Sequence, residues 1–275
     1  HHQPRRQRQM CIRDRMRLSY PAEMAQWPRP RENLVGFTTT VMGAQSESGT
    51  LAVASAQPAQ SQGEVNRQRL AEALAAAADT ETVDVQWLRQ VHGAHCIYAT
   101  PKTISDIPIA DAMWTDQVGI ALAIQSADCV PVLLAHESSA LIAAAHGGWR
   151  GLLGGVLEQL VGVLPAAAEQ LQAWIGPCIS VSHFEVGEDV WGPVISQCPD
   201  AVFPHPADSN KRMVDLVTLT RWQLRRCGIN QIAAAQKCTY ADPMFYSHRQ
   251  TTVELGAGVT TGRMASVVML AGDLR

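Results

Sequence analysis

Two short segments of this sequence carry residue types that bind metal ions or act as nucleophiles. Ser126-Ala127-Asp128-Cys129 supplies a thiol, and His146-Gly147-Gly148-Trp149-Arg150-Gly151 supplies an imidazole. Between them, two apolar runs flank the polar residues 136–139, which predicts a β-hairpin. With its turn centred on residues 137–138, Cys129 lies opposite His146, at the Cβ separation of roughly 4.5–5.5 Å found in antiparallel pairs. The two side chains are therefore candidates for two ligands of one zinc ion, or for a nucleophile and its base.

A third metal donor is His92, which follows a predicted strand and precedes Gly93. His95 is the alternative donor in the same segment. Two histidines and one cysteine leave the fourth position of a zinc ion open to water or substrate, as in catalytic zinc sites. Zinc lowers the pKa of a water bound there towards neutrality. The alternative is that His92 caps a turn and that Cys129 packs as a small buried hydrophobe.

Glycines and an arginine surround the predicted end of the hairpin. Gly147 and Gly148 allow a ligand to approach the backbone closely, and a helix starting at Gly151 offers free N–H groups to an anion. Arg150 can bind a phosphate through two parallel hydrogen bonds. These residues predict an anion site, with a glycine-rich turn and a solvated arginine as the alternative.

Asp128 lies directly before the candidate ligand Cys129. By alternation along an extended chain, Ser126 and Asp128 share one face while Cys129 points to the other. We interpret Asp128 as a catalytic or supporting carboxylate, with a turn residue as the alternative, and Ser126 as a substrate contact. Other predicted substrate contacts, each with a structural alternative in the core or in a loop, are Cys178, Glu185, His248 and Arg249.

The bulk composition is typical of an enzyme. The chain has 275 residues, 47% of them hydrophobic, which is enough for a full core. A net charge of −3 gives no electrostatic reason to expect a nucleic-acid partner, and no apolar run reaches the roughly 18 residues of a membrane span. Seven scattered cysteines without a C-x-x-C pair argue against a disulfide framework and for a reducing cytoplasm.

Alternating and apolar runs predict a single α+β domain with mixed β-sheets layered with helices. Residues 1–30 are interpreted as a disordered or spurious basic extension, because residues 1–17 contain six arginines and little apolar content. A basic interaction arm is the alternative, and the domain is expected to span 31–275. Strands are expected at 36–40, 83–91, 96–99, 120–124, 171–175 and 265–270, and helices at 64–78, 151–164, 187–198 and 214–227.

Several motifs occur together in one order, and this set resembles the laccase-domain family. Members of that family are described as multicopper polyphenol oxidases and also as purine nucleoside phosphorylases with adenosine deaminase activity. The resemblance extends from Leu34 to the C-terminus. It rests on Gln90-Val91-His92-Gly93, Ala110-Asp111-Ala112 with Thr115, Ser126-Ala127-Asp128-Cys129, His146-Gly147-Gly148-Trp149-Arg150-Gly151, Ile175-Gly176-Pro177-Cys178-Ile179, Phe184-Glu185-Val186-Gly187, and Cys238-Thr239 with Phe245-Tyr246-Ser247-His248-Arg249.

The resemblance implies a mixed fold of layered sheets and helices and a zinc site, with copper as the alternative metal. The family's metal ligands correspond to His92, Cys129 and His146. The implied substrates are purine nucleosides and phosphate, in the phosphorolysis of adenosine, inosine, guanosine and methylthioadenosine. Hydrolytic deamination of adenosine is the second implied reaction. No oligomeric state is implied.

Three segments depart from the family pattern. The family usually opens with a Phe-Ser-Thr-Arg-x-Gly-Gly type segment, where this chain has Phe37-Thr38-Thr39-Thr40-Val41-Met42-Gly43. An Asn-Leu-Gly type segment is replaced by Leu51-Ala52-Val53-Ala54, and Gln250 follows Arg249 in place of a second arginine. Since Thr40 replaces an arginine, phosphorolysis is expected to be weak if that arginine holds phosphate in the family.

Three other functions are alternatives. A cysteine hydrolase would use Cys129 with His146 or His92 as base on an amide, for instance in cell-wall precursor editing. A copper oxidase of phenols needs many histidine ligands. This chain has nine histidines, of which two lie in the N-terminal extension, and it has no His-x-His pair, so this function has less support. A binding protein with a decayed site is the third, suggested by the altered segment around Thr40.

Overall fold

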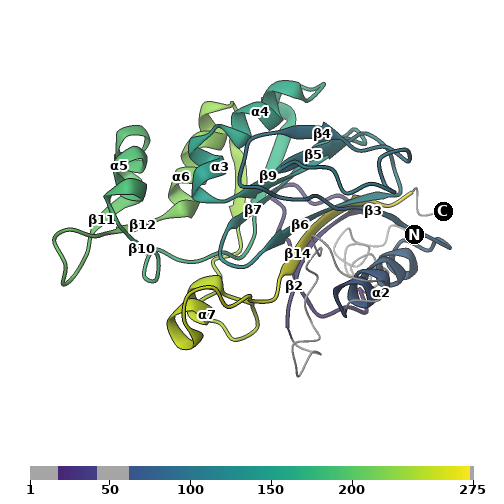
Figure 1. The fold of residues 1–275 in the computed structure, drawn as a ribbon. Coiled ribbons are helices and arrows are strands. Elements are labelled where there is room, and N and C mark those ends of the chain that lie inside the picture. Colours follow the sequence, from purple (N-terminus) through teal and green to yellow (C-terminus); the bar gives the residue numbers. More distant parts are fainter. Residues whose placement is uncertain (1–17, 42–61, 273–275) are drawn as a thin grey trace, which may run out of the picture.

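Two β-sheets lie face to face at the centre of the fold (Figure 1). The structure is a computed structural model that describes residues 18–41 and 62–272. One sheet has six strands in the order β13-β9-β7-β8-β5-β4, and the other has five in the order β1-β2-β14-β6-β3. Each sheet contains both antiparallel and parallel pairs.

The strand bounds are as follows. The six-stranded sheet contains β4 (Cys96–Tyr98), β5 (Ala112–Thr115), β7 (Val130–His136), β8 (Ile142–Gly147), β9 (Leu171–Ile175) and β13 (Gln231–Ala234). The five-stranded sheet contains β1 (Ala22–Met24), β2 (Leu34–Thr39), β3 (Asp84–Gln86), β6 (Ile120–Ser126) and β14 (Met264–Leu270). A third, small sheet joins β10 (Glu185–Val186), β12 (Arg212–Val214) and β11 (Val202–Pro204).

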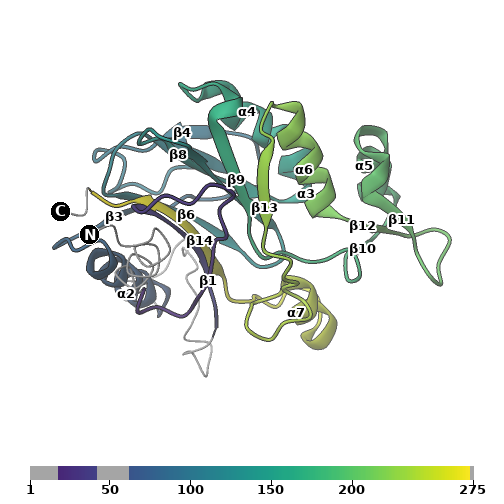
Figure 2. The ribbon, with the colours of Figure 1, turned by 180° about the vertical axis from the view of Figure 1, so that it is seen from behind.

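Helices cover the outer faces of the two central sheets, as the views from both sides show (Figures 1 and 2). Helix α2 (Gln62–Ala77) packs on the five-stranded sheet, whereas α3 (Trp149–Leu153), α4 (Val156–Val163) and α6 (Leu216–Arg226) pack on the six-stranded one. Helix α5 (Glu188–Gln197) lies by the small sheet, and α7 (His248–Leu255) lies below the strand ends in Figure 1. Short 3-10 turns occupy Ala168–Gln170 and Pro199–Ala201.

Strand β7 shows why the central strands are apolar on both faces. Val132 and Leu134 belong to the core beneath α4 and α6, while Leu133 and Ala135 belong to the core between the sheets. Side chains alternate between faces along a strand, so a strand covered on both sides is apolar throughout. All seven residues of β7 are buried. The predicted α+β domain with layered mixed sheets is confirmed.

The predicted helix at 151–164 is in fact two helices. Helix α3 ends at Gly154, and α4 begins after Gly155, which has a φ of 82°. Glycine adopts this left-handed conformation without the steric cost that other residues incur, so it interrupts the helix. The first helix also begins at Trp149, with Gly148 as its N-cap, rather than at Gly151.

The predicted hairpin is formed by β7 and β8, but its register differs by two residues. Ala135 pairs with Ile142, and His146 pairs with Pro131 rather than with Cys129. The connection is longer because His136 Nδ1 accepts hydrogen bonds from two backbone N–H groups of the loop, at 2.9 and 3.0 Å. A shift of two residues keeps every side chain on its face, so Cys129 and His146 still meet.

The boundary expected at residue 30 is wrong for the described part of that segment. Strand β1 pairs with β2, and Trp27 is buried in the core between the sheets. Gly36 makes room for this indole, since a Cβ there would lie 2.7 Å from Trp27 Cζ2. Residues 1–17 and the altered segments at Met42-Gly43 and 51–54 lie outside the described residues.

Within the described ranges, no helix combines the length and the apolar character needed to cross a membrane. All six cysteines in those ranges are free thiols.

Trp27→Ala is expected to lower the free energy of unfolding by about 3–5 kcal/mol, because it leaves a cavity between the sheets. Met24→Ala, three residues earlier and 46% exposed, serves as the control, with an expected change within about 0.5 kcal/mol. Urea unfolding followed by circular dichroism measures both. Equal stabilities of the two variants would contradict the packing of residues 18–30 on the domain.

Candidate metal centre and pocket

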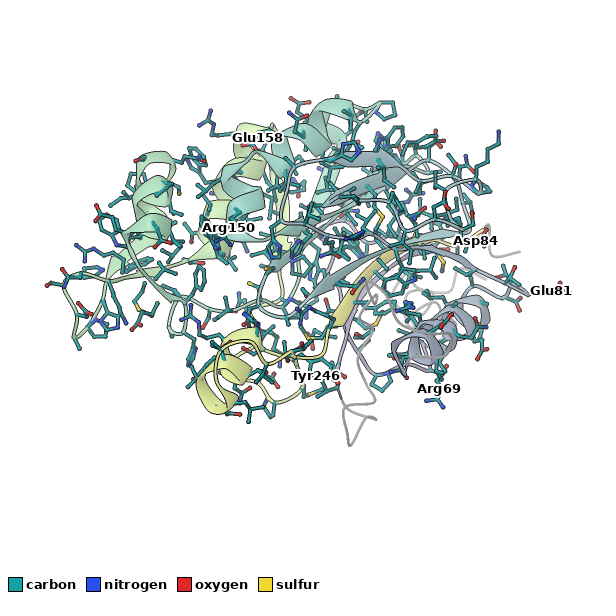
Figure 3. The ribbon with its side chains drawn as sticks, viewed as in Figure 1. Arg69, Glu81, Asp84, Arg150, Glu158 and Tyr246 are labelled. Carbon is teal, nitrogen blue, oxygen red and sulfur yellow. The ribbon has the colours of Figure 1, made fainter. Side chains whose placement is uncertain are left out.

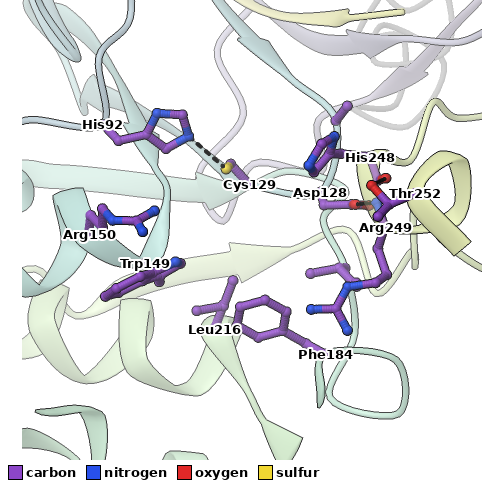
Figure 4. Close-up of a pocket in the computed structure, with 12 residues that line it drawn as sticks. His92, Asp128, Cys129, Trp149, Arg150, Phe184, Leu216, His248, Arg249 and Thr252 are labelled. Carbon is purple, nitrogen blue, oxygen red and sulfur yellow. Dashed lines mark hydrogen bonds between the residues drawn. The ribbon is translucent and has the colours of Figure 1, made fainter. Parts of the chain in front are cut away.

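The three predicted metal donors lie close together, and Figure 4 shows two of them, His92 and Cys129, side by side. One ligand atom each from His92, Cys129 and His146 lies within 4.8 Å of the others. Cys129 Sγ is 3.7 Å from His92 Nε2, near the roughly 3.5 Å that separates two donors on one tetrahedral zinc ion. The described residues contain one such group of His, Cys, Asp or Glu side chains. Its soft sulfur and two imidazoles therefore suit zinc or copper better than magnesium or calcium.

Each donor comes from a different segment. Cys129 lies in the crossover that leaves β6 in one central sheet and enters β7 in the other, while His146 is on β8. His92 lies in the loop that follows β3. The site therefore exists only where the two sheets meet, and neither sheet builds it alone.

Asp111, a fully buried residue, holds two of the donors in place. Its Oδ1 accepts hydrogen bonds from His146 Nδ1 and from the backbone N–H of His92, both at 2.9 Å. Its Oδ2 accepts from the backbone N–H groups of Val91 and Gly93, at 3.1 and 2.7 Å. Because His146 Nδ1 donates to the carboxylate, its Nε2 is left to bind a metal ion.

The predicted strand at 83–91 is shorter in the structure. Strand β3 ends at Gln86, and the N–H groups of residues 91–93 turn towards Asp111 instead of a neighbouring strand. His92 adopts a φ of 61°, which is uncommon for a residue with a side chain. The local pattern predicted a longer strand, whereas the N–H groups of residues 91–93 bind a buried carboxylate 18 to 20 positions away in sequence.

Two glycines leave the space that the donors occupy. A Cβ on Gly148 would lie 2.6 Å from His92 Cδ2 and 3.3 Å from Cys129 Sγ. A Cβ on Gly151 would lie 2.9 Å from the carbonyl oxygen of Gly93. Both glycines therefore allow the start of α3 to pack against the metal-binding loop.

The electrostatics favour a thiolate beside a protonated imidazole when no metal is bound. Burial disfavours the thiolate, but His146 and then His92 outweigh it and lower the pKa of Cys129 to about 6. Burial likewise opposes protonation of His146, yet Cys129 and Asp111 raise its pKa to about 9. A metal ion binds the thiolate and displaces the proton from the imidazole.

A pocket of about 430 Å³ opens beside these donors (Figure 4). One part of its wall is polar and the other is apolar, with aromatic rings from two separate segments. Pockets that combine apolar walls with a few convergent polar groups are typical of sites for small organic ligands. The lining residues are His92, Ala127, Asp128, Cys129, Trp149, Arg150, Ile179, Phe184, Leu216, His248, Arg249 and Thr252.

The two arginines of the pocket differ in what their guanidinium groups bind. Arg249 donates to the carbonyl oxygens of His183 and Glu185, at 3.4 and 3.0 Å, and lies over the Phe184 ring. Arg150 is exposed and lies over the Trp149 ring, 4.2 Å from its centroid. Figure 3 shows Arg150 on α3, Glu158 on α4 and Arg69 on α2. Arg150 is therefore the better candidate for an anion.

Asp128 lines the pocket, but its carboxylate is used in structural contacts. Oδ1 accepts from the hydroxyl of Thr239 and Oδ2 from the backbone N–H of Arg249, each at 2.6 Å. Its φ of 89° marks a turn, which was the alternative interpretation. Ser126 is buried at the end of β6, outside the pocket wall, and its hydroxyl has no partner among the described residues.

Three more predicted contacts lie away from the pocket wall. Gly147 is buried in β8 and packs against β7. Cys178 is buried in the core, where its backbone forms an isolated parallel β-bridge with that of Cys238. Glu185 binds Lys211 Nζ at 2.5 Å and His205 Nε2 at 2.6 Å. The structure brings together His92, Cys129, His146, Asp128, Arg150, His248 and Arg249.

Sequence reasoning missed the role of Asp111 and the aromatic walls. Both Asp111 and Phe184 occur in motifs that the resemblance rests on. Their residue types alone do not indicate a role, because that role depends on residues that only the fold brings close. Trp149 likewise lies within the glycine motif that supplied Arg150. A buried acidic residue in an apolar run was the one local sign that Asp111 has partners.

Comparisons with known proteins identify the family of this chain. A family model described as multi-copper polyphenol oxidoreductase laccase matches residues 35–271. A Pseudomonas aeruginosa protein named purine nucleoside phosphorylase PA4543 is 36% identical over 210 residues, covering 75% of this chain and 80% of that protein. Purine nucleoside phosphorylase YfiH of Escherichia coli is 36% identical over 185 residues, covering 67% and 73%. The crystal structure of Neisseria meningitidis protein NMB0706 has a TM-score of 0.78 at 31% identity, covering 91% of this chain and 99% of that one.

Asp111→Asn is expected to weaken zinc binding about 10–100-fold, because the amide cannot accept from all the groups that orient the donors. Competition with a chromophoric chelator measures the affinity, after thermal unfolding has shown that the variant folds. Asp116→Asn is the matched control, since that exposed carboxylate binds Tyr98 Oη at 2.6 Å and no donor. Equal zinc affinities of the two variants would contradict the role of Asp111.

In metal-free protein, Cys129 is expected to react with iodoacetamide as a thiolate down to pH 6, since its pKa is lowered to about 6. Below that pH the rate should fall as the thiolate is protonated. Cys227, whose pKa is raised by burial, is the internal control. His146→Gln should move the reactivity of Cys129 to higher pH. A profile for Cys129 like that of a free thiol would refute the proposed pair.

Proposed function

Since the chain belongs to the family described as multi-copper polyphenol oxidoreductase laccase, we propose that it is a zinc-dependent purine nucleoside phosphorylase. The names of its relatives support this class of reaction. The observation that carries the proposal is one pocket that joins a metal-ligand group, an exposed arginine and aromatic walls. Adenosine, inosine, guanosine and methylthioadenosine are the proposed nucleosides, and deamination of adenosine is the proposed second activity.

The pocket walls suit the two halves of a nucleoside. Trp149 and Phe184 offer flat apolar faces to a purine ring, and aromatic side chains bind such rings by stacking. Ile179 and Leu216 extend this apolar wall. His248 and Thr252 present polar groups from α7 on the opposite side, where a ribose would lie.

In phosphorolysis, Arg150 would hold the phosphate against the pentose through two charge-assisted hydrogen bonds. A phosphate oxygen forms a bond to C1′ while the bond from C1′ to the purine nitrogen breaks, which yields pentose 1-phosphate and the base. We propose that His248 donates the proton that the departing base takes up. Since Thr40 replaces the family's arginine, phosphate binding in this chain would depend more strongly on Arg150.

For deamination, water replaces the amino group at C6 of adenosine, and inosine and ammonia are the products. When bound, the metal supplies a Lewis acid, which lowers the pKa of a coordinated water towards neutrality. His92, Cys129 and His146 would hold it, with Asp111 orienting the histidines. The apolar wall would keep bulk water from the base while it reacts.

Two alternatives have less support. Multicopper oxidases need several metal centres, and a single donor group of this kind occurs in the part of the chain that the structure describes. A cysteine hydrolase could use the thiolate of Cys129 with His146, but His92 then has no assigned role. The free thiols support our proposal of a reducing cytoplasm.

The zinc-loaded protein is expected to convert inosine and phosphate to hypoxanthine and ribose 1-phosphate, with one zinc ion per chain by elemental analysis. Omission of phosphate should stop this reaction but not the deamination of adenosine. No turnover of any purine nucleoside by the loaded protein would overturn the proposal. Turnover of an amide by metal-free protein would favour the hydrolase.

Arg150→Ala is expected to raise the KM for phosphate about tenfold or more, because a charged hydrogen-bond donor is lost, and to change deamination little. Arg226→Ala is the matched control, since Arg226 also lies over a tryptophan, 4.6 Å from the Trp222 ring centroid, outside the pocket wall. Equal loss of both activities in Arg150→Ala would count against the phosphate role.

A further inference from the structure

Asp128 links the metal-binding crossover to helix α7. It directly precedes the donor Cys129, and both of its carboxylate oxygens accept short hydrogen bonds from the C-terminal part of the chain. One bond comes from the Thr239 hydroxyl, and Thr239 N–H in turn donates to the carbonyl oxygen of Cys178 at 3.0 Å. The other comes from the backbone N–H of Arg249, in the first turn of α7.

Helix α7 forms one wall of the pocket, yet it has no buried residue. His248, Arg249 and Thr252 face the pocket, while Val253 and Leu255 are 65% and 67% exposed. A helix with no buried side chain gains little from packing. Its position therefore depends on a few hydrogen bonds at its N-terminal end.

Three side chains make those bonds, namely Asp128, Arg249 and Ser247. Asp128 accepts from the Arg249 backbone, and the Arg249 side chain donates to the carbonyl oxygens of residues 183 and 185. Ser247 is the N-cap, and its hydroxyl accepts from Gln250 N–H at 3.1 Å. Asp128 is the carboxylate that ties this turn to a donor segment, and it keeps a φ of 89° to do so. Such conformations cost energy and persist where the surroundings enforce them.

We propose that Asp128 is a positioning residue that sets the substrate wall α7 relative to the metal donors, rather than a catalytic acid or base. Its two bonds hold Thr239 and α7 against the loop that carries Cys129. Substrate held by His248 and Thr252 is thereby aligned with the metal centre. The kinetic part of this inference rests on the proposed function, and its structural part does not.

The kinetic test uses Asp128→Asn, which tolerates a positive φ but offers one acceptor oxygen in place of two. We expect the KM for inosine to rise about tenfold, with kcat within about twofold of the wild type and zinc content unchanged. Ser247→Ala weakens the same helix without touching the pocket, and it should give the same signature with a smaller rise. In the double variant the two effects should not add, because both act through α7.

Asp242→Asn is the matched control. This carboxylate also accepts from a backbone N–H in the C-terminal part, that of Met244 at 3.0 Å, but it does not line the pocket. Its KM should equal that of the wild type. A large fall in kcat for Asp128→Asn with an unchanged KM, and no such effect in Ser247→Ala, would make Asp128 catalytic and overturn the proposal.

Amide hydrogen exchange tests the structural part without any substrate. Asp128→Asn should speed exchange at residues 247–255 about tenfold or more, while exchange in β6 and β7 stays unchanged. Faster exchange would support the link even if the protein turned over no nucleoside. Exchange at 247–255 equal to that of the wild type and of Asp242→Asn would refute it.

Discussion

The site depends on one buried carboxylate. Asp111 accepts hydrogen bonds from three consecutive backbone N–H groups and from the imidazole of His146. A buried charge is costly unless it is fully hydrogen-bonded. Loss of any of these hydrogen bonds would therefore destabilise the fold, which favours keeping all four donor groups in place. Two metal donors from separate segments are thereby fixed by one side chain. Replacement of Asp111 would release both donors together. Asp111 is therefore important for the metal centre although it does not line the pocket.

The crossover between the sheets is the second constraint. The chain passes from β6 to β7 in three residues, and that short path exposes Cys129 to the pocket while Asp128 turns back towards α7. Close packing of α3 against this region requires glycine at two positions, where a Cβ would meet the metal-binding loop. Gly148 and Gly151 are thus explained by clearance around the metal-binding loop, and Arg150 remains the proposed anion ligand.

Family membership and geometry bear on different parts of the function. The family description mentions copper and phenol oxidation, whereas the relatives are named as phosphorylases. The single mixed-donor group in the part of the chain that the structure describes, next to aromatic walls, supports our proposal of reactions at a purine nucleoside over electron transfer among several metal ions. The two sides of the pocket also differ in character. One side offers flat apolar surface, and the other offers polar groups on α7, a helix with no buried residue.

The sequence by itself determined the layered fold and the three metal donors. Alternating and continuous apolar runs encode strand burial locally, and the donor types at 92, 129 and 146 indicate their chemistry wherever they meet. A two-residue error in hairpin register left this result intact, because side chains repeat every two residues along a strand. Only the tertiary structure decided the roles of Asp111, Asp128 and Trp27, and only it removed Glu185 and Cys178 from the pocket. The hydrogen bonds of Asp111 and Asp128 join residues 18 to 121 positions apart, which no local periodicity specifies until the two sheets have closed on each other.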